Sequence, residues 1–330
     1  MSPKGRPEGE LLVAGAQPRS AKGAAASVSA GERVRRVGVI GTGAMGGGVV
    51  QSLVRAGVPT CARDIRAEAQ DAAVRSGATP TATPAELARA CDAVILLVVD
   101  ADEIETVLFG ADGAAEALAP GAVVVLSSTV DPAYPAALAP RLAQRGIPLL
   151  DAPVSGGPAK AAAGTMTMMV SGDPAAFGRM RPVLERITGR LFEIGPRAGD
   201  ASAFKIANNL LAAANLAAGA EAMTLALRAG LDPKQFFDVV NASSGGSWIF
   251  TDRMARALAN DYTPRAAAKI LTKDVGIAAA LAERLGVNAP LTRAAHAAFV
   301  DAVAAGYGEQ DDAALVKRAA DLAGVPHPGS

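Results

Sequence analysis

The hydrophobic positions in the first two thirds of the chain form short apolar runs that alternate with stretches of helical spacing. The apolar runs lie at 36–40, 60–63, 93–99, 123–126, 148–150, 166–171 and 191–194. Helical spacing follows at 49–56, 66–76 and 177–187, and Thr83-Pro84 supplies an N-cap and a first helical position for another helix. Because the run 93–99 has no polar alternation, it is typical of a strand buried on both faces. The alternation predicts a doubly wound α/β fold with a mostly parallel sheet.

After Gly199 the pattern changes, and only helical segments remain. We expect helices at 202–229, 250–259, 267–285, 290–305 and 312–323, with a further one starting at Asp232-Pro233. The N-terminal segment is rich in Gly, Ala, Ser, Pro and charge, which predicts a disordered tail over 1–33. The sequence thus predicts an α/β domain over 34–196 and an all-helical domain over 197–330.

Composition narrows the possible partners. Lys+Arg and Asp+Glu number 32 each, so the formal net charge is zero, and aromatic residues make up only 4%. This balance argues against nucleic acid and anionic membranes as partners. The two cysteines, Cys61 and Cys91, and the two histidines show no metal-site spacing, so we expect no metal and a cytoplasmic location. The uncharged segment 206–220 is shorter than the roughly 20 residues of a membrane span, which predicts a buried helix.

A glycine-rich loop follows the first strand. It comprises Gly41, Thr42, Gly43, Ala44, Met45 and Gly46. Gly41 permits the tight turn, Gly43 lets a pyrophosphate approach the backbone, and Gly46 lets helix and strand pack closely. The helix that follows offers free N–H groups to phosphates. An ordinary turn is the alternative in a chain with 35 glycines, but the strand before the loop and the helix after it favour a Rossmann dinucleotide site.

Asp64 ends the next strand, where dinucleotide-binding folds place an acidic residue. A carboxylate there accepts hydrogen bonds from the adenosine ribose and repels a 2′-phosphate, which favours NAD over NADP as the cofactor. Arg63 and Arg66 flank it and leave NADP open. A solvated carboxylate at a strand end is the alternative.

Lys205 stands in an apolar stretch, with Asn209 four residues later. On a helix these two side chains share one face. A charge in such a segment needs a reason, because burying an unpaired charge is expensive. A desolvated lysine has a lowered pKa and can accept the proton of an alcohol that loses hydride. The alternative is a lysine that snorkels to water.

Two loops at strand ends offer substrate and cofactor contacts. Ser155 has a hydroxyl, and Gly156 and Gly157 let backbone N–H groups approach a carboxylate, although a structural turn is the alternative. Thr129 either touches the nicotinamide or caps the backbone.

Two positions in the helical part allow two interpretations each. Lys273-Asp274 is either a surface ion pair or the source of a second cation over the substrate or cofactor. Trp248, the only tryptophan, either packs between helices or lines the substrate pocket.

These motifs stand in the order and spacing of a known family, and the chain resembles the β-hydroxyacid dehydrogenases over about residues 34–320. The motifs that carry the resemblance are 41–46, 151–157, 199–209 and 273–274. The resemblance implies a Rossmann domain joined to an all-helical substrate and dimerisation domain, assembly as a homo-oligomer, and hydride transfer between a small hydroxy acid and NAD. It implies Lys205 as the catalytic lysine, Ser155, Gly156, Gly157 and Asn209 as substrate contacts, and Thr129 and Lys273 beside the nicotinamide. We add Trp248 to the substrate residues, and Val98 and Val99 to the cofactor residues.

Within that family the chain is most similar to the enzymes that use NAD to oxidise the 2-hydroxyl of a four-carbon sugar acid such as L-threonate. The similarity lies in 107–110, 149–157, 218–223, 246–250, 261–264 and 306–308. Asn208, Asn215 and Gly246 depart from the pattern of that group. Oxidation of 3-hydroxyisobutyrate and reduction of tartronate semialdehyde (2-hydroxy-3-oxopropionate) are the alternatives among enzymes. A non-catalytic nicotinamide-binding scaffold is the alternative outside them, and the presence of Lys205 argues against it.

Overall fold

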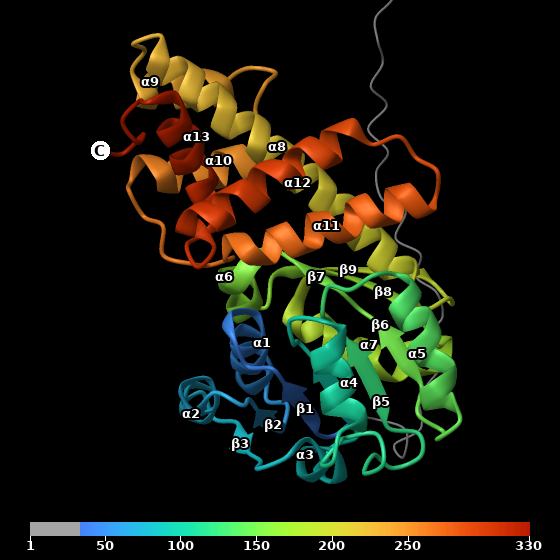
Figure 1. Ribbon diagram of the computed structural model, residues 1–330. Helices are drawn as coiled ribbons and strands as arrows, with labels where there is room; N and C mark the ends of the chain where they lie inside the picture. Colours follow the sequence, from blue (N-terminus) through green and yellow to red (C-terminus); the bar gives the residue numbers. More distant parts are fainter. Residues whose placement is uncertain (1–33) are drawn as a thin grey trace, which may run out of the picture. The chain divides into compact units, whose positions relative to one another are not determined.

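The computed structural model of the protein describes residues 34–330, so the tail predicted at 1–33 lies outside the described residues. The strands are β1 (Val37–Ile40), β2 (Thr60–Arg63), β3 (Thr79–Pro80), β4 (Ala93–Leu96), β5 (Val123–Leu126), β6 (Leu149–Asp151), β7 (Val154–Ser155), β8 (Met166–Gly172) and β9 (Thr188–Gly195). The helices among these strands are α1 (Ala44–Arg55), α2 (Ala67–Arg75), α3 (Pro84–Ala90), α4 (Ala101–Phe109), α5 (Ala133–Ala143), α6 (Gly157–Ala163) and α7 (Pro174–Ile187) (Figure 1). The later helices are α8 (Asp200–Arg228), α9 (Pro233–Asn241), α10 (Trp248–Leu258), α11 (Ala268–Arg284), α12 (Pro290–Ala302), η1 (Val303–Tyr307), η2 (Asp312–Ala314) and α13 (Leu315–Ala323).

The strands form one sheet in the order β3-β2-β1-β4-β5-β6-β8-β7, and β9 pairs with β8. All pairings from β3 to β6 are parallel, whereas β8 is antiparallel to β6 and β7. This confirms the predicted doubly wound, mostly parallel sheet. The chain leaves β1 towards β2 and β3, then crosses to β4 on the other side of β1. The carboxyl ends of β1 and β4 therefore mark the switch point, the place where such sheets bind ligands.

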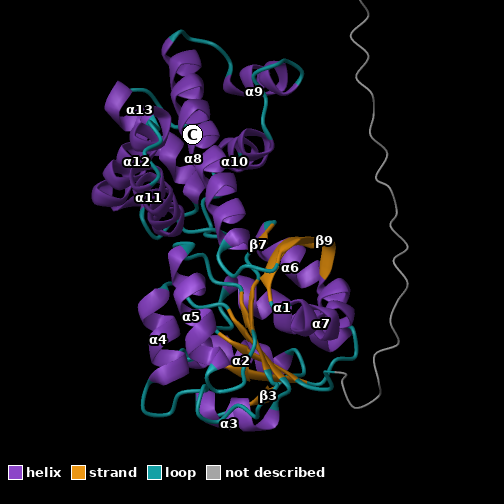
Figure 2. Cartoon of the chain, turned by 90° about the vertical axis from the view of Figure 1, so that its right-hand side faces the viewer, coloured by secondary structure: helices purple, strands orange, loops and turns teal. Residues whose placement is uncertain are grey.

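The parallel strands β1, β2, β4, β5 and β6 place hydrophobic side chains in two separate cores, one on each face of the sheet. Along β5, Val123 and Val125 join the core beneath α1 and α7, while Val124 and Leu126 join the core beneath α3, α4 and α5. Figure 2 shows these two groups of helices on opposite faces of the sheet. Burial on both faces explains why the strands lack polar alternation.

The strand predicted at 93–99 is too long, because β4 ends at Leu96. The chain turns out of the sheet to begin α4, whose N-cap carboxylate, on Asp100, accepts a hydrogen bond from Glu103 N. The Glu103 carboxylate in turn accepts from Val99 N at 2.7 Å, which completes a reciprocal cap. Val98 and Val99 consequently lie in the loop at the carboxyl end of β4.

The helical region is built on α8, which contributes Ala213, Leu216 and Met223 to a core shared with α10, α11, α12 and α13. Among the described residues α8 is the one helix long and apolar enough to cross a membrane by length and composition alone. With 29 residues α8 is longer than the uncharged segment 206–220, so its length alone does not rule out a membrane span. Core helices pass the same test, and residues such as Leu216 are fully buried. The domain division predicted near residue 196 stays a prediction.

A network of buried ion pairs holds the segment that enters α11. Arg253 of α10 pairs with Asp312, and Arg256 pairs with Asp311 at 2.9 Å. The fully buried Asp311 also accepts from Arg265 N at 3.0 Å. Buried charges are tolerated when each has partners, so this network fixes where α11 begins.

The buried carboxylate of Asp151 joins α8 to the sheet. It ends β6 and accepts hydrogen bonds from Gly199 N and Ser202 N, both at 2.9 Å, and from Ser202 Oγ at 2.6 Å. Ser171 Oγ of β8 donates a fourth at 3.2 Å. Burial raises the pKa of the Asp151 carboxyl, and these hydrogen bonds oppose the rise. The carboxylate therefore caps the N-terminus of α8 from inside the protein.

We predict that Asp151→Ala destabilises the protein by about 3 kcal/mol, because several buried donors lose their acceptor at once. Urea unfolding followed by circular dichroism measures the change. Asp238→Ala removes an exposed carboxylate paired with Lys234 and serves as the control, with no measurable change expected. Equal unfolding midpoints for Asp151→Ala and the control would contradict this role of Asp151.

Candidate active site

The glycine loop after β1 is shaped by steric limits. Gly41 has φ +86°, and a Cβ there would lie 2.5 Å from Leu97 O. A Cβ on Gly46 would lie 1.8 Å from Gly41 O. Real side chains never come so close, so both positions require glycine. The turn and the close helix–strand packing expected from the sequence are present.

The N-terminus of α1 is open to an anion. Gly43 is its N-cap, no side chain caps it, and its first turn carries no acidic residue. The guanidinium of Arg66 lies over this point, with Nη2 2.8 Å from where a Gly43 Cβ would be. Free helix N–H groups beside a cation fit the pyrophosphate of a dinucleotide.

Asp64 lies buried at the end of β2, beside the glycine loop. Its carboxylate accepts from Thr42 N at 2.7 Å, and from Arg66 N at 2.9 Å and Arg66 Nε at 3.2 Å. Burial favours the neutral acid, but the hydrogen bonds and charge of Arg66 outweigh it and lower the pKa of Asp64. The group is therefore an anion at neutral pH, and a carboxylate is a strong acceptor for ribose hydroxyls.

Lys205 and Asn209 lie on the same buried face of α8, with 9% and 7% of their surfaces exposed. Most of the Lys205 side chain is therefore out of water, as a candidate base requires, and its role stays a prediction. Within the described residues the Lys205 ammonium has neither a hydrogen bond nor a carboxylate within 4.0 Å. Burial lowers its pKa, the charge of Asp274 acts in the opposite direction, and the charge of Lys273 lowers it further. The structure thus holds a desolvated amine that gives up its proton more readily than an ordinary lysine.

A chain of contacts runs from Asn209 across α11 to the loop after β5. Asn209 Nδ2 donates to Asp274 Oδ2 at 2.8 Å, and Asn208 Nδ2 donates to Asn209 Oδ1 at 3.1 Å. Lys273 Nζ lies 2.7 Å from Asp274 Oδ1 and donates to Thr129 O at 2.8 Å. The ion pair lacks hydrogen-bond geometry, so Asp274 Oδ1 is a buried acceptor without a donor in residues 34–330.

The sequence indicated a site role for Lys273 but none for its neighbour Asp274. In the structure the Asp274 carboxylate orients Asn209 by a hydrogen bond, and its charge raises the pKa of Lys205. A buried amide on an apolar helix needs a polar partner, and that requirement was the available signal. The contact with Thr129 O uses the backbone of that residue, and its hydroxyl is not involved.

The remaining candidates lie on neighbouring loops. Ser155 ends β7, Gly156 is the N-cap of α6 with φ +124°, and Gly157 begins that helix. In the part of the chain that is described, no hydrogen bond joins this loop to Lys205 or Asn209. Trp248 begins α10 and is 59% exposed, so it is not a packed core residue.

Val98 and Val99, the two valines predicted to contact the cofactor, differ in how they are placed: Val98 lies next to the glycine loop and Val99 is exposed. Val98 Cγ1 lies 3.1 Å from where a Gly41 Cβ would be, so Val98 faces the glycine loop. Val99 is 45% exposed.

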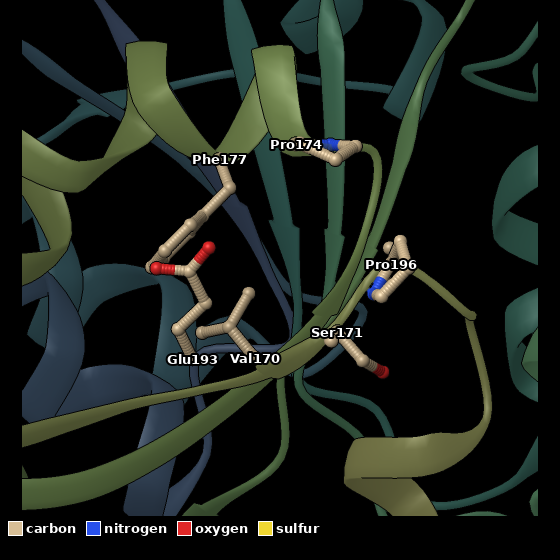
Figure 3. A pocket seen from close by; sticks show the side chains of 8 residues that line it. Val170, Ser171, Pro174, Phe177, Glu193 and Pro196 are labelled. Atoms are coloured by element: carbon tan, nitrogen blue, oxygen red, sulfur yellow. The ribbon is translucent and has the colours of Figure 1, made fainter.

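A small cavity of about 170 Å³ lies elsewhere, between β8, α7 and β9. Figure 3 shows Glu193 extending beside Phe177 on one side, with Ser171 and Pro196 on the other. It contains none of the candidate site residues, and its carboxylate is already paired with Arg181 at 2.6 Å. Ligand sites occupy roughly 300 Å³ or more, so this cavity is too small for a dinucleotide.

Comparison with known proteins identifies the family to which this chain belongs. Residues 36–195 match the NAD binding domain of 6-phosphogluconate dehydrogenase, and residues 199–319 match the NAD-binding domain of NADP-dependent 3-hydroxyisobutyrate dehydrogenase. The chain belongs to the 3-hydroxyisobutyrate dehydrogenase-like family of β-hydroxyacid dehydrogenases. It is an NAD-dependent oxidoreductase that acts on the CH–OH group of a hydroxy acid.

Particular relatives are similar over most of the chain. An L-threonate dehydrogenase of Cupriavidus necator is 48% identical over 86% of this chain and 95% of its own length. Its counterpart in Escherichia coli is 43% identical over 89% of this chain and 97% of its own length. The crystal structure of a 3-hydroxyisobutyrate dehydrogenase from Salmonella typhimurium has a TM-score of 0.81 at 42% identity, and the match covers 86% of this chain and 99% of that one.

We predict that Asp274→Asn moves the acid limb of the oxidation rate to lower pH. The Asp274 charge raises the pKa of Lys205, so its removal lowers that pKa and leaves more neutral amine at a given pH. The amide introduced by the substitution keeps an acceptor oxygen for Asn209. The pH dependence of kcat/KM checks this, and a limb that moves to higher pH or stays in place would contradict the coupling.

Proposed function

We propose that this enzyme oxidises the 2-hydroxyl of a four-carbon sugar acid, with L-threonate the first candidate, to the 2-oxo acid. Two relatives at 48% and 43% identity bear the name L-threonate dehydrogenase. The observation that carries the chemistry is the buried amine of Lys205, which has no partner within residues 34–330 and a lowered pKa. A dehydrogenase needs such a group to take the hydroxyl proton.

In the proposed mechanism Lys205 is the general base in oxidation and the general acid in reduction. The bound nicotinamide supplies the acceptor for the hydride. The neutral amine takes the proton of the substrate hydroxyl and becomes an ammonium, while the C–O single bond becomes a carbonyl. Asn209, held by Asp274 and Asn208, orients the same oxygen or the neighbouring carboxylate.

The other proposed contacts follow the order of the loops. Ser155 Oγ and the backbone N–H groups of Gly156 and Gly157 hold the substrate carboxylate, and Trp248 lines the substrate side. The proposed NAD contacts are Gly41, Thr42, Gly43, Ala44, Met45, Gly46, Asp64, Val98, Val99, Thr129 and Lys273. The open N-terminus of α1 and the anionic Asp64 support the adenosine and pyrophosphate part of this assignment.

A second candidate substrate is 3-hydroxyisobutyrate. The solved Salmonella typhimurium relative, with a TM-score of 0.81, bears the name 3-hydroxyisobutyrate dehydrogenase. The two candidates differ in the oxygens that lie beyond the reacting carbon, so a panel that contains both acids separates them.

The cellular location that we propose is the cytosol, because a reducing compartment fits the two free, buried cysteines.

We predict that Lys205→Met lowers kcat for L-threonate oxidation by about 10²–10⁴, the usual contribution of a general base. NADH binding is expected to stay within about twofold of wild type, because Lys205 does not hold the adenosine half. NADH formation and nicotinamide fluorescence measure the two quantities. Turnover that survives Lys205→Met would refute the mechanism. A wild-type enzyme that oxidises other hydroxy acids but not L-threonate would refute the substrate.

We further propose that two or more copies of the chain associate through α8. The helix exposes Phe204, Leu211 and Leu225, which are 59%, 61% and 71% exposed and lie along one face. Light scattering after size exclusion is expected to give a dimer or larger, and Leu225→Glu is expected to weaken it. A wild-type monomer at micromolar concentration would contradict the proposal.

A further inference from the structure

Lys160 lies over the loop proposed to hold the substrate carboxylate. It belongs to α6, four residues after Gly156. A Cβ placed on Gly156 would lie 2.9 Å from Lys160 Cδ and 3.1 Å from its Cβ, so the lysine stem covers that glycine. The charged end lies only two bonds further along the side chain than the Cδ that covers Gly156.

The ammonium of Lys160 meets the face of Trp248, with Nζ 5.5 Å from the ring centroid. This contact joins α6 to the first residue of α10. Trp248 is the only tryptophan in the sequence, and 59% of its surface is exposed. An ammonium beside an open aromatic face offers N–H donors and an apolar surface to the same ligand.

Lys160 also differs from most described lysines in having no polar partner. Lys234 and Lys269 pair with carboxylates at 2.9 and 2.6 Å. Lys273 and Lys317 have polar partners as well. Over residues 34–330 only Lys160 and Lys205 have neither a hydrogen bond nor an ion pair. Both lie on the elements that the proposed substrate would contact.

We propose that Lys160 and Trp248 form a subsite for the substrate oxygens beyond the reacting carbon, so that the enzyme selects acids with oxygens at that end. This inference rests on the proposed function for the place of the carboxylate. A sugar acid suits the pair, because its hydroxyl oxygens accept from the ammonium and its C–H groups pack on the ring. A second carboxylate shares the acceptor chemistry, and the experiment distinguishes the two.

The test measures binding without turnover. In a Lys205→Met background with saturating NAD, Trp248 is the sole source of tryptophan emission, and titration gives Kd for each acid. L-Threonate is compared with (R)-2-hydroxybutyrate, which has the same carbon chain and lacks the hydroxyls on C3 and C4. Adding Lys160→Met, which keeps an unbranched stem, is expected to raise Kd for L-threonate about tenfold. Kd for (R)-2-hydroxybutyrate is expected to change less than about twofold.

Lys317→Met is the matched control, since its ammonium also lies over an aromatic ring, 4.7 Å from the centroid of Tyr262. It is expected to leave both affinities unchanged. Equal weakening of both acids by Lys160→Met would mean that Lys160 binds the shared carboxylate, which overturns the proposal. Unchanged affinities, or emission that responds to neither acid, would overturn it too.

A third ligand, tartrate, has a second carboxylate where L-threonate has a terminal hydroxyl, so its Kd shows which of the two kinds of oxygen the subsite prefers. A loss of tartrate binding larger than that of L-threonate supports the subsite with a carboxylate as its preferred occupant, and a smaller loss supports it with hydroxyls. If wild type fails to oxidise L-threonate while Lys160→Met still weakens its binding selectively, the proposed function fails and the subsite stands.

Discussion

The arrangement of this molecule depends on one buried carboxylate. Asp151 ends β6, the strand at the end of the parallel run from β3 to β6, and accepts hydrogen bonds from the N-terminus of α8. Lys205 follows Ser202 by three residues, so the carboxylate sets where the lysine enters the protein. The buried Asp151 carboxylate can keep its charge because backbone N–H groups and serine hydroxyls donate hydrogen bonds to it. The sheet and the helix that carries the candidate base are thereby joined through one residue.

The second constraint is the balance of charge around Lys205. Burial and the nearby Lys273 favour the neutral amine, while Asp274 favours the ammonium. Asp274 also holds Asn209, so one carboxylate both tunes the amine and orients the amide beside it. The ion network of Arg253, Arg256, Asp311 and Asp312 fixes the start of α11, on which Asp274 is carried. Position and pKa are therefore set by the same packing.

Much of the fold could be predicted from local sequence. β2 and β5 lie where their apolar runs placed them, and Asp232 caps α9 as Asp-Pro predicted. Local sequence failed where tertiary contacts decide: β4 ends early because Glu103 reaches back to Val99, and α6 lacks a periodic apolar pattern. The candidate site shows the same contrast between residues that local sequence could predict and residues that it could not. Lys205 stood out as a charge in an apolar run, whereas Asp274 and Lys160 gain meaning only from partners on other elements.

The proposed role of Lys205 rests on one property, the lowering of its amine pKa by burial. It is tested most directly by labelling lysine with ¹³C at the ε position and following each signal by NMR as pH rises, with the Lys205 signal identified by its absence in Lys205→Met. We expect Lys205 to titrate below the ordinary lysine value of about 10.4 and before the exposed lysines do. Titration of Lys205 together with the exposed lysines, or above them, would contradict it.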